Sequence, residues 1–133
     1  MKLKLKQYTE PLTIEVERPD GTTDVVELTL NLSDTNVLRS EKAARKIVEA
    51  ADGMKGDDPE KQERELGKLL SGAIDIVAGE GAAEKIVAAF GVASAVDCVS
   101  GLVDVWKGIN EEAVRRSAEK RVENLSRYLD ADA

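Results

Sequence analysis

The sequence contains no histidine, and this absence limits the chemistry that the chain can perform. Histidine is the commonest general base at neutral pH and the commonest metal ligand. Without it, neither a Ser-His-Asp nor a Cys-His catalytic arrangement can form within the chain. Cys98 is the single cysteine, which excludes an intrachain disulfide and a cysteine cluster for zinc. We therefore expect a protein that is not an enzyme and holds no cofactor or metal.

Aromatic residues are also scarce, which constrains how the core is built. A core made of Leu, Val, Ile and Ala favours closely packed helices and argues against a deep, aromatic-lined ligand pocket. A chain of 133 residues suits one domain. We predict a single domain over residues 1–133, with a β unit at 1–32 and a helical part at 33–133. The aromatic residues are Tyr8, Phe90, Trp106 and Tyr128.

The sequence has fewer basic than acidic side chains, and its formal net charge is −7. An acidic chain repels phosphate backbones, so we expect no nucleic-acid partner. Lys2, Lys4 and Lys6 form a local basic run, but they alternate with leucines as on the solvated face of a strand. The apolar runs are too short to span a bilayer, and a lone cysteine without a signal peptide fits a reducing compartment. We expect a cytoplasmic protein without a membrane partner.

The first third of the sequence has the period-two alternation of β-strands. Apolar residues alternate with polar ones in two runs, 12–16 and 26–32, and more briefly around Leu3 and Leu5. Between the two longer runs lies Arg18-Pro19-Asp20-Gly21, which is typical of a tight turn. This pattern predicts an antiparallel β-hairpin, or a three-stranded meander if the first run also pairs.

After the β unit, apolar residues recur at helical spacing, and residues typical of helix starts and ends stand between these segments. Ser33 or Asp34 is placed to cap a first helix, in which Val37, Ala44, Val48 and Ala51 recur at helical spacing. A second helix is predicted to begin with a cap and a proline at 58–59 and to end at Gly79, and a short third helix covers 82–90. The fold class that we predict is α+β and predominantly helical, with about four helices of which the last is long.

The last predicted helix runs without proline from Ser94 to about Leu129. Its apolar residues form a heptad-like seam that slips register near 113–118 and then resumes. Gly101 and Gly108 lie beside the seam and suggest close approach of another backbone, within the monomer or between copies. The seam is therefore either core or interface, and a homo-oligomer is one expectation. The candidate interface residues are Val99, Leu102, Trp106, Ile109, Val122 and Leu125.

Two segments that suggest ligand-binding loops are better explained as residues that begin or end helices. Asp57, Asp58 and Glu60 lack the alternating ligand spacing of a calcium loop and instead fit a helix N-terminus. The run 79–81, Gly-Glu-Gly, lacks the lysine and serine of a phosphate-binding loop. Neither segment supports a binding site for an ion or a nucleotide.

One local stretch carries a family resemblance. Residues 79–91 read Gly-Glu-Gly-Ala-Ala-Glu-Lys-Ile-Val-Ala-Ala-Phe-Gly. This stretch, followed by a long helix and preceded by a small β unit, resembles the tail assembly chaperones of bacteriophages and prophages with long, non-contractile tails. The resemblance implies a non-enzymatic protein of the bacterial host cytoplasm that binds and solubilises the tape measure protein and helps to recruit tail tube protein. It implies no residue-level binding site.

Two other interpretations of the sequence remain open. The chain also fits a structural component of a phage tail or head–tail connector. Alternatively, it is a helical protein-interaction or regulatory module that pairs through its last helix. A tail tube gene and a long tape measure gene on either side of its own gene would favour the chaperone over the regulatory module.

Overall fold

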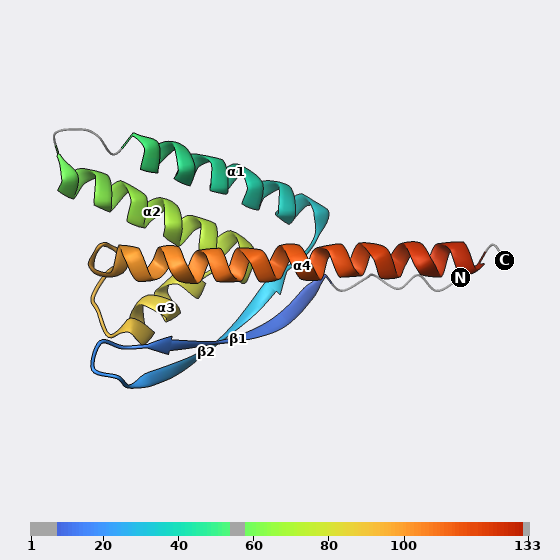
Figure 1. The fold of residues 1–133 in the computed structure, drawn as a ribbon, viewed down its shortest axis with the longest axis horizontal. Coiled ribbons are helices and arrows are strands. Elements are labelled where there is room, and N and C mark those ends of the chain that lie inside the picture. Colours follow the sequence, from blue (N-terminus) through green and yellow to red (C-terminus); the bar gives the residue numbers. More distant parts are fainter. Residues whose placement is uncertain (1–7, 54–57, 132–133) are drawn as a thin grey trace.

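The computed structural model describes residues 8–53 and 58–131 of the 133-residue chain. In that part of the chain, a two-stranded antiparallel hairpin is followed by four α-helices, of which the last is the longest (Figure 1). The predicted α+β, predominantly helical fold class is therefore confirmed. The possible further strand around Leu3 and Leu5, together with the lysines that alternate with it, lies outside the described residues.

The hairpin pairs β1 (Thr9–Glu17) with β2 (Thr23–Asn31). Leu12 lies opposite Leu28, and Ile14 lies opposite Val26, so the apolar residues of both strands share one face. In β2 that face is buried throughout, whereas in β1 most of it is half-buried. A hairpin of this size is marginal alone, and here its apolar face is covered by α2 and α3.

The turn between the strands forms where the sequence predicts it. The N–H of Gly21 donates to the carbonyl oxygen of Arg18 at 2.9 Å, and Gly21 has a φ of 86°, which favours glycine. The Asp20 carboxylate accepts hydrogen bonds from the hydroxyl and the N–H of Thr22, and these bonds lower the pKa of Asp20. Arg18 Nε then donates to the carbonyl oxygen of Ala89 at 2.8 Å, which ties the turn to the third helix.

Helix starts and stops follow local capping chemistry. In α1 (Asp34–Asp52), Ser33 is the N-cap, because its hydroxyl accepts the N–H of Asn36 at 3.3 Å. In α2 (Pro59–Ala78), the Asp58 carboxylate accepts the N–H of Lys61 at 3.2 Å. The short α3 (Ala82–Phe90) ends at a glycine in the left-handed conformation. The predicted boundaries of these helices are confirmed.

The long helix begins later than the sequence predicts. Residues Ala95–Cys98 form a 3-10 turn, η1, and α4 itself spans Val99–Ala131. Ser94 does not cap the helix with its side chain. Its carbonyl accepts the N–H of Asp97 at 3.1 Å and its hydroxyl bonds the Asp97 carboxylate at 3.2 Å. These bonds close a tight turn over three residues in place of the first α-helical turn.

The central element is α2, which contacts α1, α3, α4, η1 and β2. The core is aliphatic, as the composition predicts, and it draws on the hairpin and on every α-helix. The largest fully buried side chains are Leu30, Leu70, Ile74, Ile86, Leu102 and Ile109.

The face that α1 buries differs from the predicted stripe. Val48 is 55% exposed and Ala51 is exposed, whereas Ile47 is buried. Asn36 is also buried, and its side-chain amide donates to the carbonyl oxygens of Asn31 at 2.9 Å and Ile76 at 2.7 Å. These two bonds fasten the start of α1 to β2 and to the last turn of α2. In α1 as it lies, Val48 and Ala51 of the predicted stripe face solvent, while Val37 and Ala44 are half-buried.

Candidate functional site

The first half of α4 is part of the core. Leu102 is 0% exposed and Ile109 is 2% exposed, and Ala113 is also buried. Val99 and Trp106 are half-buried and pack against this core. The part of the candidate interface from Val99 to Ile109 therefore lies inside or against the monomer, where α4 crosses α2.

Within the monomer, the two glycines of α4 do not mark approaching backbones, so that part of the interpretation is wrong, while close approach between copies stays a prediction. A Cβ at Gly101 would lie 2.8 Å from the ring of Phe90, so a side chain occupies the space that this glycine leaves. At Gly108 no atom outside the adjacent backbone of α4 lies within 4 Å of such a Cβ. Close backbone approach occurs instead at Gly67 of α2, where a Cβ would be 3.6 Å from the backbone of Ala95.

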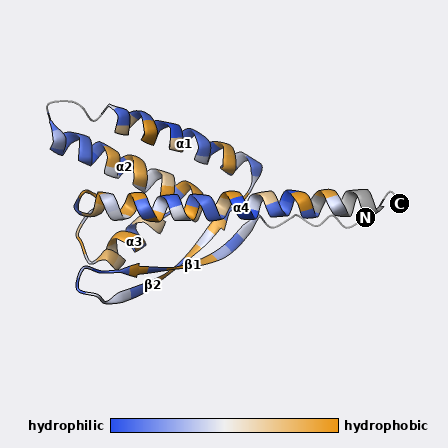
Figure 2. Cartoon of the chain, in the orientation of Figure 1, coloured by the Kyte–Doolittle hydropathy of each residue, from blue (hydrophilic) through white to orange (hydrophobic). Residues whose placement is uncertain are grey.

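The second half of α4 carries an exposed apolar stripe, which consists of Val114, Ala118, Val122 and Leu125. Val122 is 65% exposed, Leu125 is 59% exposed and Val114 is 58% exposed. Spacings of four, four and three residues place these side chains on one helix face. The last part of α4 extends beyond the other elements (Figure 1), and hydrophobic positions are interspersed among hydrophilic ones along it (Figure 2). The sequence pattern alone did not single out Val114, although it stands one helical turn before Ala118.

Charged side chains fasten α4 to the body just before it projects. Arg116 Nη1 donates to the carbonyl oxygen of Pro11 at 2.8 Å and lies 3.5 Å from Glu10 Oε2. Lys120 Nζ lies 3.5 Å from Glu10 Oε1, and Arg121 Nη2 lies 3.3 Å from an Asp34 carboxylate oxygen. The contacts reach both β1 and the first turn of α1. Val122 and Leu125 follow directly after this set of contacts.

Several charged side chains beside the stripe form ion pairs with one another within α4. Arg115 pairs with Glu112 and with Glu119, and Arg116 Nε donates to Glu112 at 2.8 Å. Hydrogen bonds from Arg115 and then Arg116 lower the pKa of Glu112. These pairs lie at the surface, and each is worth little by itself. They offset the charges of Glu112, Arg115, Arg116 and Glu119, which stand beside Val114 and Ala118 of the stripe.

A groove between α1 and α4 adjoins the stripe at Val114. Its α1 wall includes Val37 and Ala44, which belong to the predicted α1 stripe that does not enter the core. The hydroxyl of Ser40, which has no hydrogen-bond partner in the described part of the chain, also lines it. The apolar surface of the projecting end thus continues onto the body of the protein.

Candidate chemical sites are few. Burial, followed by the nearby charge of Asp97, raises the pKa of the Cys98 thiol, so this thiol stays protonated at neutral pH. Within residues 8–53 and 58–131, no three carboxylates or cysteines cluster in a way that would hold a metal ion. In the same residues no single helix has the length and apolarity to cross a membrane, although the bent pair Ala82–Phe90 and Ala95–Glu123 passes by length and composition.

The three parts of α4 therefore have different surroundings. Its first half is held in the core, its middle is fastened by charges, and its end offers apolar side chains to solvent. Comparisons with family models, with curated proteins and with solved structures find no match for the chain.

Proposed function

We propose that the protein is a tail assembly chaperone of a phage or prophage, which binds the tape measure protein in the bacterial cytoplasm and keeps it soluble during tail assembly. The observation that carries the proposal is the exposed stripe Val114, Ala118, Val122 and Leu125 on the second half of α4. The local resemblance of residues 79–91 to such chaperones supplies the identity of the partner.

The proposed mechanism is physical. Exposed leucine and valine on one helix face pack against the apolar stripe of an amphipathic client helix, which removes apolar surface of both from water. The net charge of −7 keeps the resulting complexes apart in solution by mutual repulsion. No catalytic step is required, and tail tube protein would join once the client is held.

The test is co-expression of the tape measure protein with variants of this chain. Val122→Asp with Leu125→Asp places two carboxylates in the stripe. Because both residues are exposed, the variant should fold and yet fail to keep the client soluble. The matched control is Val48→Asp with Leu38→Asp on α1, where the same residue types are 55% and 62% exposed. The control should retain the chaperone effect.

Two outcomes would count against the proposal. If the tape measure protein is equally insoluble with and without the unaltered chain, the chaperone function fails. If purified particles contain the protein at the copy number of a structural subunit, a role as a tail or head–tail connector component replaces it.

A further inference from the structure

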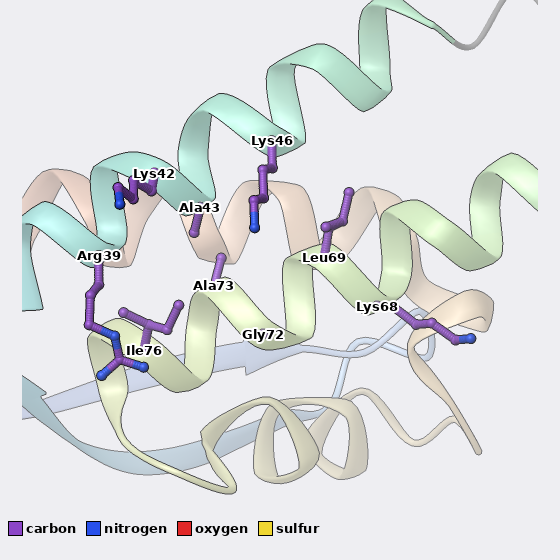
Figure 3. Close-up of a pocket in the computed structure, with 9 residues that line it drawn as sticks. All are labelled: Arg39, Lys42, Ala43, Lys46, Lys68, Leu69, Gly72, Ala73 and Ile76. Atoms are coloured by element: carbon purple, nitrogen blue, oxygen red, sulfur yellow. The ribbon is translucent and has the colours of Figure 1, made fainter.

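A second surface, on α1 and α2, has the opposite charge to the rest of the chain. Arg39, Lys42 and Lys46 stand on one face of α1 at spacings of three and four residues, and Lys68 joins them from α2. These four residues line a groove between the two helices, which we call the α1–α2 groove (Figure 3). The lining of this groove includes no carboxylate.

The floor of the α1–α2 groove is apolar. At Gly72 no atom outside the adjacent backbone of its own helix lies within 4 Å of the position of a Cβ, so the glycine leaves open space in the groove. The other floor residues, Ala43, Leu69, Ala73 and Ile76, lie between the basic side chains (Figure 3). The surface thus combines an apolar base with cationic edges.

The four cations have no partner within the described part of the chain. Glu49 and Glu65 stand three residues from Lys46 and Lys68, a favourable spacing on a helix, but neither forms an ion pair with them. Like charges at three- and four-residue spacing disfavour a helix rather than stabilise it. In a chain of net charge −7, this concentration of unpaired cations is complementary to an acidic partner.

We infer that the α1–α2 groove docks an amphipathic helix of another protein whose apolar stripe is flanked by carboxylates. The apolar stripe would lie on the floor around Gly72, and the carboxylates would meet Arg39, Lys42, Lys46 and Lys68 at the edges. This surface lies on different helices from the projecting stripe of α4. The inference therefore does not depend on the chaperone proposal and holds for any function of the chain.

The placement of the cations favours a helix over smaller or flatter anionic ligands. Arg39 points from α1 toward α2 at one end of the groove. At the other end, Lys68 points from α2 away from the space between the two helices (Figure 3). A single phosphate would need these groups to converge. Single-stranded nucleic acid would need aromatic side chains for base stacking, and the groove has none. A membrane surface takes up an apolar helix face that is turned toward it, whereas the apolar floor here is recessed between basic side chains.

The first experiment compares two synthetic helical peptides by fluorescence anisotropy at low and at physiological salt. Both carry the same leucine and alanine stripe, and the flanking positions are glutamate in one and lysine in the other. We expect the glutamate peptide to bind at least roughly tenfold more tightly, with an affinity that falls as salt rises. Equal binding of the two peptides, or no binding of either, would overturn the inference.

Two matched pairs of variants then locate the site. Lys46→Glu should weaken binding of the glutamate peptide by roughly tenfold, whereas Arg45→Glu makes the same charge change on a neighbouring exposed residue outside the groove and should leave binding nearly unchanged. Gly72→Met fills the open floor and should abolish binding. Its control is Gly108→Met, at another exposed glycine with free space around it. Circular dichroism checks that all four variants fold.

Other occupants would show themselves in the same assays. Equal losses in Lys46→Glu and Arg45→Glu would mean general charge attraction and would contradict a defined groove. Displacement of the peptide by anionic lipid vesicles or by a single-stranded oligonucleotide, each at lower concentration than the peptide, would assign the groove to those ligands. Self-association that disappears in Lys46→Glu, seen by sedimentation, would assign it to a second copy of the chain. Each of these results would overturn the proposed occupant.

Discussion

Gly101 and Gly108 lie seven residues apart on α4 but have opposite surroundings. The ring of Phe90 fills the space beside Gly101, while the space beside Gly108 is open. Alanine is favoured over glycine inside a helix by about 1 kcal/mol. We therefore expect Gly108→Ala to raise the free energy of unfolding by about that amount. At Gly101 the added methyl group displaces the Phe90 ring, so Gly101→Ala should be less stable than Gly108→Ala by about 1 kcal/mol or more.

Urea denaturation of the two alanine variants measures this difference directly. Equal stabilisation by both substitutions would show that the Phe90 ring moves aside without cost. Contact with that ring would then no longer explain why position 101 is a glycine.

At the scale of elements, the two halves of α4 differ most clearly in their leucines. Leu102 is 0% exposed and Leu125 is 59% exposed. Leu102→Ala leaves a cavity in the core and should lower the free energy of unfolding by about 2–5 kcal/mol. Leu125→Ala removes the same atoms from an exposed position and should change it by less than about 0.5 kcal/mol. Chemical denaturation checks both, and a large loss at Leu125 would place the projecting end in the folding core.

A pH dependence follows from the charge contacts in the middle of α4. Hydrogen bonds from Arg115 and Arg116 lower the pKa of Glu112 in the folded protein. A carboxyl with a lowered pKa contributes stability that is present above its ordinary value, 4.5, and is lost as the pH falls through the lowered pKa. The stability difference between the unaltered chain and Glu112→Gln should therefore be largest near neutral pH and vanish in acid.

The control is Glu111→Gln, which removes the same charge from an exposed neighbour that forms no ion pair within the described residues. Unfolding curves of the three proteins across the acidic range provide the comparison. A difference between the unaltered chain and Glu112→Gln that stays constant with pH would contradict a stabilising role for these contacts.

Apart from the start of α4, element boundaries could be predicted from the sequence because they depend on local backbone chemistry. Asp58 caps α2 through a bond within the same turn, and Gly21, Gly79 and Gly91 adopt positive φ values that few other residues accept. The orientation of α1 could not be predicted in this way. It depends on the bonds of Asn36 to Asn31 and Ile76, and Ile76 is 40 residues away in the sequence.

The candidate site was only partly predictable for a related reason. A seam of apolar residues at helical spacing looks the same whether it packs inside the monomer or against a partner. Whether a seam residue is buried depends on where α4 lies against α2. Leu102 and Ile109 are buried in the core, whereas Val122 and Leu125 are exposed. The basic face of α1 is not evident from the sequence, because Glu41 and Arg45 fall among its residues and only the helix turns them away from the groove.

At the scale of the whole molecule, one aliphatic core holds the hairpin and all four helices, and one helix leaves that core. The acidic surface is interrupted by the basic α1–α2 groove, and the end of α4 exposes apolar side chains. These two surfaces differ in charge and lie on different elements. The stripe lies outside the core, whereas the floor of the groove includes Ala73, which is part of the core.

The most direct test of the central claim is hydrogen exchange of the chain with and without the tape measure protein. Amides of α4 that follow Arg121 lie past the contacts with β1 and α1, so they should exchange readily in the free protein. Binding through the stripe should slow exchange over residues 114–125 and leave the core half, residues 99–113, as it was. Unchanged exchange over residues 114–125 in a complex that has demonstrably formed would contradict the claim that this stripe is the binding surface.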